Sequence, residues 1–257
     1  MRRLIKDEKL LAVLGVIEEE IKHDIVEAEM SEEMAALYTC GVSRHEGQWL
    51  FLHETNRVYS DTTLFHELMH VILWIEGWPN YYIRQYYTRK NPEYHEKWRG
   101  LDKMAELAVN ILQHPTIWQR GNQYGYSEMD EWNRQVSDDE MFSGHHTTEW
   151  EDRFVEEYLI GGQALHLAHA MLSPAALKLK SDLKRQAQSH LPKAFQIVEH
   201  ICCVQEQLGK FFPESFDDAR KKVFEATNMP QDILMPDPFD RPPPYPLFFS
   251  ERILSVL

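Results

Sequence analysis

Apolar residues recur at helical spacing along several long stretches of the chain. Residues 3–30 carry leucine and isoleucine on one side of a helix, which predicts a long amphipathic helix there. From about Thr147 the same periodicity returns in four segments, each opening at a Ser, Thr or Pro start signal. These segments predict helices over residues 147–172, 174–189, 192–209 and 213–227. The chain is therefore expected to be mainly helical.

Two short stretches break this helical pattern. Ala36–Val42 and Gln48–His53 have the composition of strands, and they flank a turn at Arg44–Gly47. Residues 119–148 are polar and contain glycine, which predicts a loop with one short helix near Ser127–Val136. The predicted fold class is α+β and predominantly helical, with a small sheet before the helix described next and a helical C-terminal lobe.

The stretch Thr62–Leu73 contains a His-Glu-x-x-His motif inside an apolar run. His66 and His70 lie one helical turn apart, so both imidazoles can reach one metal ion. Glu67 is turned aside from the pair, where its carboxylate can act on a metal-bound water. The helix is expected to begin at the capping residues 60–63 and to end at Gly77.

A structural explanation of the motif has to be weighed beside the chemical one. The two histidines could belong to an ordinary core helix and simply form hydrogen bonds. The residues between and before them are uncharged, however, which predicts a buried helix. Buried His and Glu side chains need partners, and a metal ion supplies one. The metal site is therefore the favoured interpretation.

On these residues the chain resembles the zincin metallopeptidases. The metzincin branch needs a Gly and a third His where this chain has Leu73 and Glu76, so that branch is set aside. The gluzincin branch takes its third ligand from a Glu-x-x-x-Asn helix, which Glu106 and Asn110 match. This pattern is similar to that of the small ImmA/IrrE-type gluzincins. The second helix is expected from about Glu93 to Gln113, stopped by Pro115.

The resemblance implies a Zn²⁺ ion held by His66, His70 and Glu106, with a fourth position left for water. It implies Glu67 as the general base and Asn110, one turn after Glu106, as the residue that holds a ligand in place. Its edge strand would pair with an extended peptide substrate. The expected function is zinc-dependent hydrolysis of peptide bonds.

Several other polar residues remain open as parts of this site. If Glu106 is not the third ligand, the next candidates are His95, His114 and Glu149. The donor that stabilises the oxyanion is not identified by the sequence, and the candidates are His145, His146, Tyr124 and Tyr126. His166 and His169 could also bind a metal, but no carboxylate stands at helical spacing before them, which favours a core or interface role.

The amino-acid composition bears on the compartment in which the protein works and on the kinds of partner that it binds. The 257 residues have a formal charge of −14, which argues against general nucleic-acid binding because phosphate contact needs a basic surface. Three cysteines, two of them adjacent, do not form a disulfide framework and indicate a reducing compartment. No apolar run is long enough to span a bilayer. We therefore expect a cytoplasmic protein without a membrane partner.

The chain shows no repeat and no clear linker, so a single zincin-like domain over residues 1–257 is expected. Within it, residues 1–115 would form an upper lobe with both ligand helices, and residues 116–229 a helical lobe. The Pro-rich tail, residues 230–257, would extend and dock back onto the body. The aromatic residues of segment 78–92 would line a cleft or form a packed lid.

Two other functions stay open at this point. The chain could have a zincin fold without catalytic activity and act as a scaffold or sensor that binds a partner protein through its helical half. An intact Glu67 argues against this, because a structural metal site does not need a general base. Hydrolysis of a non-peptide amide uses the same ligands and is the other alternative.

Overall fold

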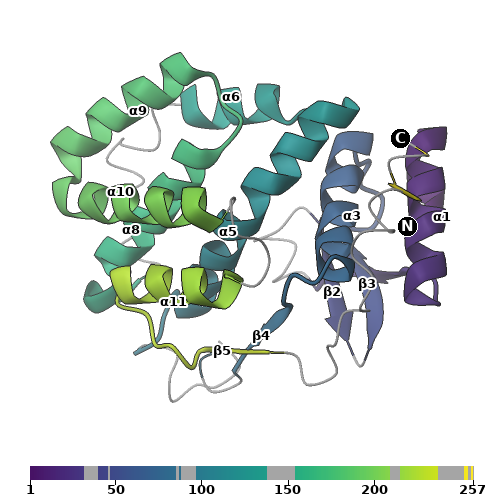
Figure 1. Cartoon of the computed structure of the whole chain (residues 1–257), viewed down its shortest axis with the longest axis horizontal. Helices are drawn as coiled ribbons and strands as arrows, with labels where there is room; N and C mark the ends of the chain where they lie inside the picture. The colour runs from purple at the N-terminus through teal and green to yellow at the C-terminus, as the bar shows by residue number, and fades with distance from the viewer. Residues whose placement is uncertain are drawn as a thin grey trace. The chain divides into compact units, whose positions relative to one another are not determined.

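The computed structural model describes residues 1–31, 40–45, 47–84, 87, 97–137, 154–208, 215–236, 252–253 and 256. The chain divides into two compact units. The first unit comprises Met1–Asn80, Arg120–Ser127 and Asp237–Leu257, and the second comprises Tyr81–Gln119 and Glu128–Pro236. The predicted fold class is confirmed, because the described elements are mostly helices and a small sheet precedes the motif helix (Figure 1).

The first unit begins with a short 3-10 helix η1 (Arg2–Leu4) and the helix α1 (Glu8–Ile21). The prediction of one helix over residues 3–30 is wrong at both ends. Lys22 adopts a left-handed conformation with φ 62°, which ends α1. Residues Val26–Glu29 then form the strand β1, since their backbone groups pair in parallel with a later strand.

The sheet of the first unit has three strands in the order β1-β3-β2. The strands β2 (Cys40–His45) and β3 (Gln48–His53) form the predicted antiparallel hairpin, with Val42 opposite Phe51. Residues 36–39, which the prediction assigned to the first strand, lie outside the described residues. Gly47 supplies the positive φ of 86° that the turn requires. Buried residues alternate along β3, so one face of the sheet belongs to the core.

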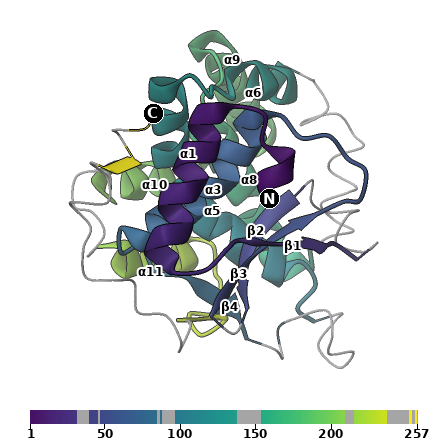
Figure 2. The ribbon, with the colours of Figure 1, turned by 90° about the vertical axis from the view of Figure 1, so that its right-hand side faces the viewer.

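The motif helix is α3 (Asp61–Ile75), and both of its predicted ends are confirmed. At the start, the Ser60 hydroxyl accepts a hydrogen bond from the Thr63 N–H at 3.0 Å. At the end, Gly77 has φ 98° and allows the chain to leave the helix. Helix α1 runs alongside α3 (Figure 2), and the Trp74 ring of α3 meets the Trp49 ring of β3 edge-on.

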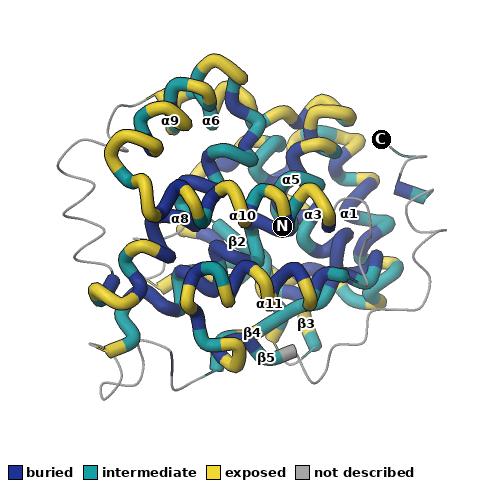
Figure 3. Tube along the Cα trace, turned by 60° about the vertical axis from the view of Figure 1, so that its left-hand side comes forward, coloured by how far each residue is buried: buried dark blue, intermediate teal, exposed yellow. Residues whose placement is uncertain are grey.

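The second unit is built from helices that pack around α8 (Glu156–Leu172) and α10 (Pro192–Leu208). It also contains α6 (Met129–Ser137), α9 (Leu177–His190) and α11 (Phe216–Ala226). The predicted short helix and the four predicted helices therefore exist, with shifted ends. Buried and exposed turns alternate along α9, α10 and α11 (Figure 3), as amphipathic helices at the rim of a core require.

Helix α5 (Leu101–Tyr124) begins and ends later than the prediction of about Glu93 to Gln113, and residues 97–100 form a turn before it. It passes through Pro115, where the expected stop signal fails. A proline inside a helix lacks the N–H that would donate to Ile111 and costs about 3 kcal/mol. The apolar face continues beyond it with Ile117 and Trp118, both buried, so burial offsets that cost. Residues 119–124, predicted as loop, are therefore helical.

The segment that follows the last helix returns to the body of the second unit. Leu234–Pro236 form the strand β5, which pairs antiparallel with β4 (Tyr81–Ile83). These residues belong to the segment predicted to dock back onto the body, and residues 237–251 of that segment lie outside the described part of the chain. In the aromatic segment, Trp78 and Tyr87 are buried, which agrees with a packing role.

Among the described residues, no helix is long and apolar enough to cross a bilayer.

Two glycines provide a matched test of how tightly the second unit is packed. A Cβ at Gly161 of α8 would lie 2.4 Å from the Thr227 carbonyl oxygen, whereas a Cβ at Gly15 of α1 meets nothing within 4 Å. We expect Gly161→Ala to lower the free energy of unfolding by about 1–3 kcal/mol, because the two backbones must separate. Gly15→Ala should raise it by roughly 0.5–1 kcal/mol through helix propensity. Urea unfolding midpoints measure both changes, and an unchanged midpoint for Gly161→Ala contradicts the close packing.

Candidate metal centre

The polar side chains of the motif lie on the less buried face of α3. Leu64, Phe65, Leu68 and Met69 are buried, whereas Thr63, His66, Glu67 and His70 are half-buried. The half-buried residues follow the i, i+3, i+4, i+7 spacing of one helix face. The centroids of the two imidazole rings are 5.1 Å apart. Packing thus holds the helix while its polar stripe stays accessible.

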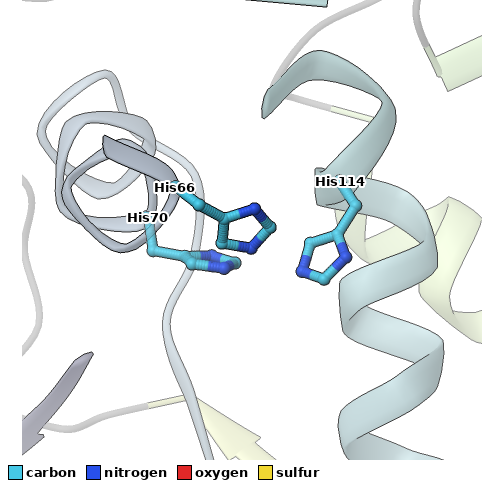
Figure 4. A group of neighbouring side chains, drawn as sticks. All are labelled: His66, His70 and His114. Carbon is cyan, nitrogen blue, oxygen red and sulfur yellow. The ribbon is translucent and has the colours of Figure 1, made fainter. Parts of the chain in front are cut away.

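A third histidine completes this pair. The ligand nitrogens of His66, His70 and His114 all lie within 4.8 Å of one another. Figure 4 shows the two rings from α3 and the ring from α5 directed toward one another. Three imidazole nitrogens at such spacing can surround a single cation of the zinc type.

The last turns of α5 are anchored to α3 inside the first unit. Arg120 forms a bidentate ion pair with Glu76, with Nη1–Oε1 and Nη2–Oε2 distances of 2.9 and 2.8 Å. The Phe65 ring stacks on Tyr126, two residues past the end of the helix, at 4.5 Å. His114 precedes Arg120 by six residues, which is about 9 Å along a helix. Glu76, the residue at the metzincin ligand position, is therefore engaged by Arg120.

Glu67 is held by the strand β2. Its Oε2 accepts a hydrogen bond from the Val42 N–H at 3.0 Å, and the Cys40 sulfur lies 4.0 Å from Oε1. Burial, together with the neighbouring Glu67 charge, raises the pKa of the Cys40 thiol far above its usual range. Cys40 is therefore a neutral thiol at physiological pH, beside a carboxylate with a fixed orientation.

Glu106 and Asn110 both lie on α5, as predicted, and both are half-buried. The Glu106 carboxylate lies 3.4 Å from the Lys103 ammonium group, and Glu106 is not part of the histidine group. Its role as third ligand stays a prediction. His114 follows Asn110 by four residues, so Glu106, Asn110 and His114 mark one stripe of the helix at four-residue steps. That spacing is the sequence signal that could have favoured His114.

The structure describes two of the other candidate residues, Tyr126 and Tyr124. The Tyr126 hydroxyl donates a hydrogen bond to Asp7 at 3.0 Å, and burial and the Asp7 charge raise the pKa of Tyr126 well above its usual value. This bond directs the Tyr126 hydroxyl to the start of α1. Tyr124 packs against Phe65 at 6.4 Å. The other candidates, His95, His145, His146 and Glu149, lie outside the described residues.

Comparisons of this chain with protein-family models, with curated proteins and with solved structures find no match. The chemistry of the site itself therefore has to carry the functional argument.

Metal content separates the two possible third ligands. We expect about one zinc ion per chain in the zinc-supplemented protein. We expect His66→Ala and His114→Ala to weaken zinc binding by more than about 100-fold, since each removes a donor atom. Glu106→Gln should retain zinc. Elemental analysis and chelator competition give the measurement.

Loss of zinc in Glu106→Gln, with zinc retained in His114→Ala, would instead identify Glu106 as the third ligand. Val109→Ala serves as a packing control on the same helix, because it shortens a half-buried side chain to which no role in the site is assigned; it should retain zinc.

Proposed function

We propose that this chain is a zinc-dependent metallopeptidase in which His66, His70 and His114 bind the metal and Glu67 is the general base. The observation that carries the proposal is the convergence of three imidazoles, two of which share an accessible stripe of α3 with a carboxylate. A purely structural site would need the ligands but would have no use for the carboxylate at that position. We expect the reaction to be hydrolysis of a peptide bond by water.

The donor set fits zinc. Imidazole suits borderline cations such as Zn²⁺, and three histidines leave a tetrahedral ion one open position. When bound, the ion lowers the pKa of a coordinated water and polarises a substrate carbonyl. The two histidines of α3 are half-buried, which favours access of water and substrate to that position. The same donor set accepts other metals, so the metal is part of the proposal.

Glu67 is suited to moving a proton because one of its oxygens is already fixed. The Val42 N–H donates to Oε2 at 3.0 Å and the Cys40 thiol donates to Oε1 at 4.0 Å. We assign Oε1, which has the longer contact, as the oxygen that accepts the proton of the attacking water. The same oxygen then delivers that proton to the nitrogen of the leaving amine. The water oxygen ends on the carbonyl carbon, and the C–N bond breaks. A carboxylate held by a backbone donor needs little reorganisation for either step.

A peptide substrate is favoured over other amides by the strand beside the base. Val42 directs its N–H to Glu67 and not to β3, so this side of β2 faces the base. In an antiparallel pair such outward positions recur every second residue, so Cys40 and Arg44 direct their backbone groups to the same side. An extended peptide could pair with these groups and pass its scissile bond next to Glu67.

Replacing the base tests the proposal. We expect Glu67→Gln to lower hydrolysis of a quenched-fluorescence peptide library by at least about 1,000-fold, because the amide cannot accept the proton. Zinc content and the unfolding midpoint should stay close to those of the unmodified protein. Glu54→Gln is the control, since Glu54 is exposed and pairs only with Arg57 among the ion pairs of the described residues. Its activity should be unchanged.

Two outcomes would overturn the proposal. Zinc-loaded protein that cleaves no peptide in the library but cleaves small acyl amides would make the site an amidohydrolase centre. A biological effect that survives Glu67→Gln would favour a scaffold that binds a partner.

A further inference from the structure

His169 of α8 contacts a proposed metal ligand directly. Its Nε2 lies 2.8 Å from Nδ1 of His114, and the two ring centroids are 4.9 Å apart. Both residues belong to the second unit. The sequence favoured a core or interface role for His169, because no carboxylate stands at helical spacing before it. The structure supplies its partner from another helix.

The bond to His169 decides which nitrogen of His114 can bind a cation. Because His169 engages Nδ1 of His114, we assign Nε2 as the nitrogen that would bind a metal. A histidine ligand requires its metal-binding nitrogen to be deprotonated, which places the proton of the neutral ring on Nδ1. The hydrogen bond then runs from His114 Nδ1–H to the lone pair of His169 Nε2. An acceptor at that position fixes both the tautomer and the orientation of the ligand.

Aromatic rings enclose this imidazole pair. Trp118, one turn after His114, lies 5.3 Å from both imidazole centroids. Trp132 of α6 meets the His169 ring edge-on at 5.0 Å, and Trp118 is itself anchored by its indole N–H, which donates to Glu128 at 3.1 Å. Rings at these distances leave little room for water to compete for the hydrogen bond. A low local dielectric strengthens the bond.

Helix α8 cannot shift easily to relax this contact. A Cβ at Gly161 would collide with the Thr227 carbonyl, and one at Gly162 would come within 2.7 Å of the Phe154 ring. These close approaches restrain the helix from two directions, two turns before His169. The acceptor is therefore held by packing that does not depend on a metal.

We infer that His169 is a positioning residue of the metal centre: its Nε2 accepts the Nδ1–H of His114 and holds that ring with Nε2 ready to bind the metal. The inference rests on the proposed role of His114 as a ligand, but it concerns metal affinity and needs no substrate. It assigns a role to a helix that contributes no ligand itself.

The test compares zinc affinity among variants of the full-length protein. We expect His169→Phe, which keeps the ring shape without the acceptor, to weaken zinc binding by about 10–100-fold in competition with a chromophoric chelator. His169→Gln, whose amide oxygen can accept the Nδ1–H, should recover part of that loss. The visible spectrum of the Co²⁺-loaded protein should change in His169→Phe, because the orientation of one ligand has changed.

His166→Phe is the matched control, because His166 lies on the same helix one turn earlier and is equally half-buried. It should bind zinc as tightly as the unmodified protein. Equal affinity of His169→Phe and the unmodified protein would overturn the inference. An equal loss in the His166 and His169 variants would also overturn it, since helix packing would then be the cause. A protein that binds zinc with these differences but cleaves no peptide would refute the proposed function and leave this inference standing.

Discussion

The ion pair between Glu76 and Arg120 is the interaction that holds the last turns of α5 against α3 within the first unit. Glu76 follows directly after α3, its side chain is only 6% exposed, and both of its oxygens are engaged by the guanidinium. Losing one partner of such a pair costs about 3–5 kcal/mol, because the other charge remains buried. The pair therefore strongly favours one placement of the last turns of α5 beside α3.

This anchor explains why α5 runs through a proline. The helix has to continue past Pro115 to bring Arg120 to Glu76 and to bury Ile117 and Trp118. The cost of Pro115, about 3 kcal/mol, is local, and these contacts offset it. Helix α5 consequently contributes residues to both units, with Arg120 in the first and His114 in the second.

Helix α3 combines a packing role with a chemical one on separate faces. Its apolar residues contact α1 and the sheet, and its polar stripe carries two imidazoles and a carboxylate. The strand β2 supplies the backbone donor that orients Glu67. Two of the proposed functional groups thus have a neighbour that limits their motion: Val42 for Glu67, and His169 with Trp118 for His114. Such support reduces the reorganisation that catalysis requires.

The sequence by itself determined the features that depend on neighbours along the chain. The ends of α3, the β2–β3 hairpin and the relation of His66, Glu67 and His70 follow from capping residues and helical spacing, which are local. The tertiary structure alone decided that α1 ends at Lys22, that α5 passes Pro115, and that His114 joins the His pair with His169 behind it. These depend on contacts between residues distant in the sequence, such as Glu76 with Arg120 and β1 with β3, whose burial outweighs local propensity.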